Sequence, residues 1–169
     1  FKQKTAYEIK ECDWSSDVCS SDLDDDYVGA VRDGHPSHLA ASNGIGWTER
    51  LFEAASLSTG GAIAAVLEAY TTGSNAGSLS SGLHHARGDH GSGYCTFNGL
   101  AIASFRARAA GAARVMILDL DAHCGGGTES IIRGHDGIEQ VDVSVVRYDT
   151  YLPTAQARQR MAGAADYLT

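Results

Sequence analysis

An apolar run that ends in alternating acidic residues constrains the fold of this chain more than any other feature. Residues 115–118 are continuously apolar, and Asp119 and Asp121 follow directly. Short apolar runs of this kind are typical of strands that are covered on both faces, as in parallel sheets between helices. Because ligands of such sheets bind beyond the carboxyl ends of the strands, we expect a buried strand with a functional site directly after it.

The segments on either side of this run alternate between helical and extended patterns. The sequence predicts helices over 24–34, 47–58, 58–70, 97–111 and 127–134, and short strands over 76–85 and 141–146. Ser58 or Thr59 is expected to cap the third helix, and Gly111 is expected to end the fourth. Strand–helix alternation without hairpin signals predicts an α/β fold with a parallel sheet.

Composition excludes several classes of protein. The chain has 169 residues, 43% hydrophobic and 20% charged, which favours one domain with a core over disorder. Its net charge of −8 argues against non-specific nucleic-acid binding, which requires a basic surface. No apolar run approaches the roughly 18 residues of a membrane span, and no signal peptide is visible. We therefore expect a cytoplasmic protein without nucleic-acid or membrane partners, whose oligomeric state the sequence does not specify.

The first 23 residues differ from the rest of the chain. They show no helical or strand periodicity, and they resemble translated sequencing adapter that recurs at the ends of unrelated open reading frames. We exclude residues 1–23 from the fold as a non-native or disordered segment, with a genuine N-terminal arm as the alternative. The folded domain is then expected over residues 24–169. The chain starts with Phe1, so we expect its true start to be missing.

The cysteines show no spacing that indicates a metal site or a disulfide framework. There are four, Cys12, Cys19, Cys95 and Cys124, and none forms a C-x₂-C pair. Cys95 and Cys124 lie in apolar segments beside glycines. We therefore expect reduced thiols, as in a cytoplasmic protein.

Three residues at the end of the apolar run form the first candidate site. Residues two apart on a strand point to the same side, so Asp119, Asp121 and His123 would share one face. Two unpaired carboxylates are costly to bury, and a cation would offset their charge. Asp and His ligands suit Zn²⁺, with Mn²⁺ and Fe²⁺ as alternatives. The competing interpretation is an acidic strand end that caps the next helix or pairs with an arginine.

Two adjacent histidines, His84 and His85, form the second candidate site. Histidine titrates near neutral pH, so it can serve as a general base and then as a general acid; the alternative is a pair of surface histidines. Gly93 and Tyr94, which precede Cys95, either line a pocket or pack in the core. The remaining histidines are expected at the surface: His35, His38, His90 and His135.

The order and spacing of these motifs resemble a known family. Segments 84–98 and 115–129 are similar to the histone deacetylase-like amidohydrolases, a family with bacterial relatives that act on acetylated polyamines. The family pattern has a His-His pair, then Gly-Phe/Tyr-Cys at a fixed offset, then a strand ending in D-x-D-x-H-H-G-D-G. The offset from His85 to Gly93 matches without a gap. The resemblance implies a three-layer, arginase/deacetylase-like fold, with helices on both faces of a parallel sheet, truncated at its C-terminus.

The resemblance also implies an activity. It points to zinc-dependent hydrolysis of acetyl or other acyl amides of lysine side chains, polyamines or small amines. Asp121 and His123 would be zinc ligands, and His85 would be the general base. His84 would be the neighbouring imidazole, oriented by Asp119.

Two further sites follow from the resemblance. Gly93 and Tyr94 would line the tunnel that admits the acetylated substrate. A structural K⁺ would lie beneath the zinc strand, at positions that match Asp119, Asp121, His123 and Ser144.

The chain departs from the family pattern at two positions. Cys124 replaces the second histidine of the H-H-G motif. Gly126 replaces an aspartate that normally partners one of the paired histidines, which affects the strength of His85 as a base. The third zinc ligand, an aspartate on a later strand, and a late tyrosine that stabilises the oxyanion are not among the 169 residues. We therefore expect the fragment alone to be inactive.

Two other functions remain open at this point. The departures at Cys124 and Gly126 allow a non-catalytic module that binds acyl-lysine or amines. A manganese hydrolase of the arginase type shares the strand–helix architecture. It would carry more carboxylate ligands, and the His-His and Gly-Tyr-Cys motifs argue against it.

Overall fold

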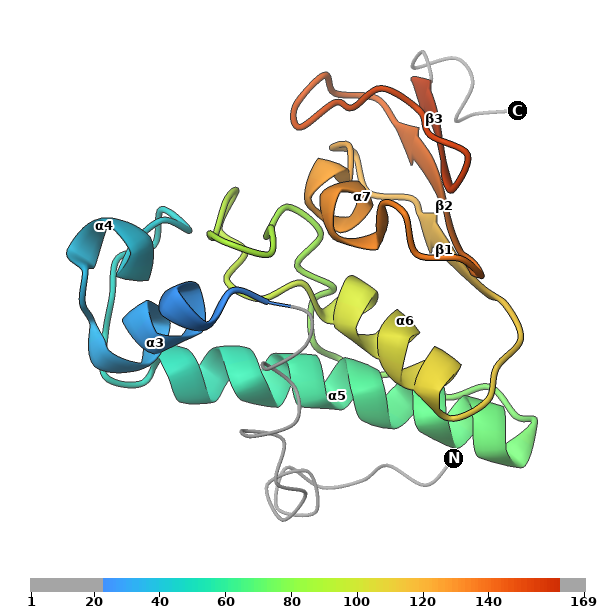
Figure 1. Cartoon of the computed structure of the whole chain (residues 1–169), viewed down its shortest axis with the longest axis horizontal. Helices are drawn as coiled ribbons and strands as arrows, with labels where there is room; N and C mark the ends of the chain where they lie inside the picture. The colour runs from blue at the N-terminus through green and yellow to red at the C-terminus, as the bar shows by residue number, and fades with distance from the viewer. Residues whose placement is uncertain (1–22, 162–169) are drawn as a thin grey trace.

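The structure is a computed structural model that describes residues 23–161 (Figure 1). The segment excluded above therefore lies outside the described residues, except for Leu23, as do Cys12 and Cys19. The elements follow in the order α3 (Asp25–Asp33), α4 (Ser37–Ala40), α5 (Leu51–Thr72), α6 (Gly99–Ala109), β1 (Val115–Asp119), α7 (Gly126–Ile132), β2 (Ile138–Ser144) and β3 (Ala157–Met161).

The three strands form one parallel sheet in the order β1-β2-β3. Asp119 at the end of β1 lies opposite Asp142 on β2, so the carboxyl ends of these strands meet at one edge. Figure 1 shows the long α5 along the base of the molecule, α6 above it, and the sheet beside α7. The predicted α/β class with a parallel sheet is confirmed, and β3 is a strand that the sequence patterns did not predict.

Side-chain caps explain where two of the helices begin. Asp24 Oδ1 accepts hydrogen bonds from the backbone N–H groups of Asp26 and Tyr27 at the start of α3, which satisfies donors that the first turn leaves free. That helix ends at Gly34, as predicted, with φ of 78°. Asn98 caps α6 by accepting from Ala101 N.

The two helices predicted on either side of Ser58 are a single helix, so that prediction is wrong. Helix α5 continues through Ser58, Thr59 and two glycines without a break. Gly61 lies inside this helix and packs closely against Ser78, whose Oγ would be 2.5 Å from a Cβ at this position, so this glycine marks a close approach rather than a helix end. By length and mean hydropathy, α5 could also cross a membrane. One such helix is a weak indication, because core helices of soluble proteins pass the same test.

One strand prediction is wrong, and another strand is less buried than predicted. Residues 76–85 form no strand; their serines bond to one another and to α5 instead. The strand β1 is covered on one face only within the described residues. Ile117 is 6% exposed, whereas Met116 and Leu118 are 65% and 54% exposed. The apolar run therefore identified the strand correctly but overestimated its burial.

The main core lies where α3, α5 and α6 meet. Phe97 is fully buried and packs edge-to-face against Tyr27 and Phe52. Such pairs contribute about 0.5–1.5 kcal/mol beyond their area burial. The Tyr27 hydroxyl donates to Thr96 O at 2.7 Å, so this core also fixes the segment that follows the Gly-Tyr-Cys motif.

Candidate active site

The loop that carries His84 and His85 is held between two helices. Asn98 Nδ2 donates to Ala86 O at 2.9 Å, with His84 O at 3.3 Å. Thr128 N, in the first turn of α7, donates to His84 O at 2.9 Å. Both histidines are buried, so the alternative of two surface histidines is wrong.

His84 is oriented by a buried carboxylate. Its Nδ1 lies 2.6 Å from Asp119 Oδ2. Because an ionised carboxylate only accepts, the ring nitrogen must be the donor. Burial lowers the pKa of His84, but the hydrogen bond and charge of Asp119, together with Asp121 and Asp142, outweigh it, so the pKa is raised. The structure thus brings together two residues that the sequence separates by 35 positions.

His85 is oriented by a residue that the motifs did not indicate. Its Nδ1 donates to Asp149 Oδ2 at 3.0 Å, and Asp149 lies in the loop after β2. Burial lowers the pKa of His85, the neighbouring His84 and His123 lower it further, and Asp149 raises it; the net direction is downward. A histidine that stays neutral near pH 7 can accept a proton there.

Two imidazole rings and a tyrosine lie against the ring of His85. The ring centroids of His84 and His123 lie 4.0 and 5.6 Å from that of His85. Tyr148 packs edge-on against His85 at 4.8 Å and against His123 at 5.7 Å. No sequence signal indicated Tyr148, which lies in the same loop as Asp149.

The two predicted zinc ligands lie beyond the end of the strand. Because β1 ends at Asp119, Asp121 and His123 do not lie on the strand itself. Asp119 and Asp121 nevertheless both face His84, whose Nδ1 and Nε2 lie 2.6 and 3.7 Å from their carboxylates. Asp121 and His123 lie in the following loop, with side chains 52% and 46% exposed. Asp121 Oδ1 accepts from His123 N at 2.8 Å and lies 3.1 Å from its Nδ1.

These two donors fit zinc as a partial ligand set. Burial raises the pKa of Asp121, but hydrogen bonds and the charge of nearby histidines lower it by more, so the pKa is lowered and the carboxylate is ionised. A carboxylate and an imidazole are both zinc ligands. Among residues 23–161, however, no group of three or more His, Cys, Asp or Glu side chains is placed to hold a metal.

Gly93 lies against the ring of His85. A Cβ on Gly93 would lie 2.5 Å from Cδ2 of the His85 ring, so only glycine allows this approach. Tyr94 is 72% exposed and has φ of 65°; it therefore does not pack in the core. Cys95 and Cys124 are buried and form no disulfide within the described residues.

The four residues matched to a K⁺ site divide into two groups. Asp119 and Ser144 are buried at the ends of neighbouring strands, and Ser144 Oγ lies 2.9 Å from Cys124 Sγ. The side chains of Asp121 and His123 are exposed on the loop above. The K⁺ site therefore remains a prediction.

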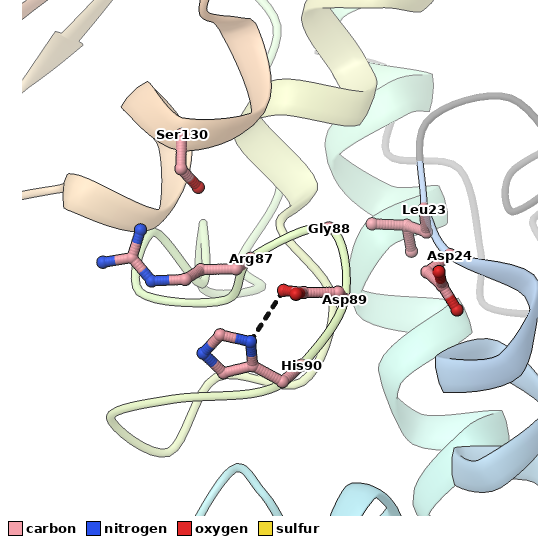
Figure 2. A pocket seen from close by; sticks show the side chains of 7 residues that line it. All are labelled: Leu23, Asp24, Arg87, Gly88, Asp89, His90 and Ser130. Carbon is pink, nitrogen blue, oxygen red and sulfur yellow. Dashed lines mark hydrogen bonds and ion pairs between the residues drawn. The ribbon is translucent and has the colours of Figure 1, made fainter.

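A pocket of about 560 Å³ lies next to this cluster (Figure 2). Arg87 reaches towards the helix that carries Ser130, and Asp89 binds His90 at 2.7 Å. The lining contains none of the predicted site residues; it consists of Leu23, Asp24, Arg87, Gly88, Asp89, His90 and Ser130. The candidate active site is thus the histidine cluster, and only Arg87 connects it with this pocket.

A buried acid beneath the site makes stability depend on pH. Asp142 is fully buried; its Oδ2 accepts from Gly125 N, and its Oδ1 has no hydrogen-bond partner among residues 23–161. Burial raises its pKa, so the folded chain holds this proton at pH values where the unfolded chain has lost it. Protonated Asp142 therefore stabilises the folded chain at low pH, and this stabilisation is lost as pH rises from about 4 through the raised pKa.

Substitution of Asp142 by asparagine is expected to raise the free energy of unfolding at pH 8 by about 1–3 kcal/mol. The amide oxygen can still accept from Gly125 N, but no charge is buried. The gain should shrink towards pH 4, where the aspartate is protonated. Urea unfolding across this range measures it, with exposed Asp136→Asn as the control. An Asp142→Asn effect that is constant with pH would contradict the assignment.

Comparison with known proteins places this geometry in a family. The sequence profile of the histone deacetylase domain matches residues 11–167. The chain is 38% identical over 117 residues to a probable deacetylase of Methanothermobacter thermautotrophicus, covering 63% of this chain and 35% of that protein. It is 40% identical over 83 residues to acetylpolyamine amidohydrolase 1 of Pseudomonas aeruginosa, covering 47% of this chain and 24% of that protein.

Solved structures agree on the fold. A histone deacetylase homologue from Aquifex aeolicus superimposes with a TM-score of 0.63 at 22% identity, covering 72% of this chain and 35% of that one. The HD domain of HDA15 superimposes with a TM-score of 0.60 at 23% identity, covering 85% and 38%. The chain spans about a third or less of the length of the curated relatives named above. The profile match covers most of the chain, which therefore belongs to the histone deacetylase domain family.

Proposed function

We propose that this chain supplies the general base and two ligands of a zinc-dependent deacetylase. One observation carries the proposal: two buried histidines, each bonded to its own aspartate, lie against the loop of Asp121 and His123. Zn²⁺ is the preferred metal, with Fe²⁺ and Mn²⁺ as alternatives. The K⁺ site at Asp119, Asp121, His123 and Ser144 belongs to the same proposal.

The proposed mechanism divides the work among these residues. Asp121 and His123 would hold the zinc ion, which when bound polarises an acyl carbonyl and acidifies a water molecule. His85 carries its proton on Nδ1, because that atom donates to Asp149; its Nε2 is then free to accept a proton from water. The same nitrogen gives the proton to the departing amine when the C–N bond breaks. His84, with its raised pKa, would hold a positive charge beside the reacting groups.

The proposed substrates are acetyl amides of polyamines, of lysine side chains or of other small amines. Tyr148 exposes aromatic surface beside His85 and His123, which suits the alkyl chain of such an amine. Tyr94, which is 72% exposed, would line the same tunnel together with Gly93. We further propose a cytoplasmic protein without nucleic-acid or membrane partners.

A second candidate is a binding module for acyl-lysine or amines that has no catalytic activity. This candidate is supported by the small number of metal ligands: within the described residues only two donors, rather than three or more, are placed together. The 169-residue chain alone is therefore expected to bind zinc weakly and to hydrolyse no acetyl amide.

The complete gene product that contains this chain is expected to release acetate from an acetylated polyamine or an acetyl-lysine peptide. Chelation should abolish the release, and added zinc should restore it. Acetate release and metal content by mass spectrometry are the measurements. Binding of these compounds without any acetate release would favour the binding module, and full activity after metal removal would contradict the zinc mechanism.

A further inference from the structure

Position 126 has no room for the carboxylate that the family pattern places there. A Cβ on Gly126 would lie 2.6 Å from Asp149 Oδ1 and 2.8 Å from Asp149 Cγ, and it would also overlap the backbone oxygen of Asp149. Real Cβ atoms do not approach other atoms so closely. The space beside Gly126 is thus filled by a carboxylate from a different part of the chain.

Asp149 is held in this space by three donors. Oδ2 accepts from His85 Nδ1 and from Gly127 N, both at 3.0 Å. Oδ1 accepts from Arg87 Nη2 at 2.5 Å. The side chains of His85 and Asp149 are 6% and 8% exposed. Three donors on two oxygens hold this carboxylate in one position.

The backbone of Asp149 is strained in this position. Its φ is 57°, in the left-handed region that few residues other than glycine adopt, although aspartate tolerates it better than most. Strain of this kind persists where the surrounding contacts enforce it. Here these contacts are the three donors on the carboxylate and the bond from Cys124 N to Tyr148 O.

We infer that Gly126 and Asp149 are an exchanged pair. Asp149, from the loop after β2, orients His85 in place of the aspartate that the family pattern has at position 126, and glycine at 126 makes room for it. Asp149 is a positioning residue, since it acts through His85. Its effect on catalysis rests on the proposed function, whereas its effect on the His85 ring does not.

A variant at Arg87 distinguishes two roles of Asp149: orientation of His85, or an ion pair with Arg87 that only stabilises the fold. It bonds Asp149 and also donates to Gly126 O at 3.2 Å, but it bonds neither ring nitrogen of His85. If Asp149 serves only to pair with Arg87, loss of either residue should have the same effect on His85. If Asp149 positions His85, only its own loss should change the ring.

The test is the tautomer of His85 in the zinc-free complete gene product, read by ¹⁵N NMR of labelled histidine at pH 8, with His85→Ala for assignment. The parent protein and Arg87→Ala should show Nδ1–H. Asp149→Gly, which also relieves the backbone, should lose this preference. An unchanged tautomer in Asp149→Gly, or the same change in Arg87→Ala, would overturn the inference.

Kinetics and stability give two independent readouts. In the zinc-loaded protein, Asp149→Gly should lower kcat by roughly 10²–10⁴-fold with little change in KM, as expected when a base is held in the wrong tautomer. Absence of hydrolysis in the parent protein would count against the proposed function alone, because the tautomer is measured without substrate. Gly126→Asp should lower the free energy of unfolding more when introduced alone than when combined with Asp149→Gly. If the effects of the two substitutions were additive, the two side chains would not compete for the same space, and the inference would be contradicted.

Discussion

Substitution of Gly127 by alanine is expected to lower the free energy of unfolding by about 3 kcal/mol or more. The added Cβ would lie 2.5 Å from both His84 O and Ala86 O and would also overlap the backbone carbon of His85. Asn98 and α7 hold this loop, so the backbone cannot shift without breaking those bonds. Denaturant unfolding of the chain and of the variant measures the loss.

The matched control is Gly29→Ala. Gly29 lies inside α3, and a Cβ there would meet nothing within 4 Å. Alanine is the better helix former, so this variant should gain about 0.5–1 kcal/mol. If both alanine variants changed stability by the same amount and sign, the close approach of α7 to the histidine loop would be refuted.

The second large effect is expected for His85→Ala in the complete gene product. Loss of a general base should lower kcat by about 10²–10⁴-fold, while the zinc content stays unchanged. His123→Ala should instead lower the zinc content, because it removes a ligand. Acetate release and metal analysis on the same samples separate the two roles, and exposed His38→Ala is the control. Wild-type kcat in His85→Ala would exclude it as the base.

The sequence predicted those parts of the site in which the residue types themselves carry the chemistry. Each of the two motifs, His84-His85 and the acids Asp119 and Asp121, leaves a structural role open by itself; their order and spacing together indicate the site through the family resemblance. The contact of His84 with Asp119 follows from the family pattern. The helices α3, α6 and α7 were also predicted, with Gly34 as the expected end of α3 and Gly111 as the expected end of α6.

Asp149 could not be predicted in the same way. It lies 64 residues from His85, in a loop whose path depends on the parallel pairing of β2 and on the bond to Cys124 N. A single acidic residue in a loop has no periodicity to mark it. The departure at Gly126 was visible, but only the packed backbone shows which side chain fills the vacated space.

Errors of secondary structure had a common origin. Local residue preference suggested a helix start at Ser58 or Thr59, whereas one helix runs through both residues and its Gly61 lies close to Ser78 of the following segment. The strand expected over 76–85 had small, polar residues that pack in an irregular segment instead. In both places contacts distant in sequence outweighed local propensity.

The side-chain amide of Asn98 links the histidine loop to the first turns of α6 and α7. It caps α6 through Ala101 N and contacts His84 O, Ala86 O and Thr128 Oγ1. The loop therefore cannot open without freeing the first turn of α6, so we expect both to exchange their amide hydrogens with solvent as one cooperative unit. The two histidines would then keep their spacing on every timescale shorter than partial unfolding of the domain.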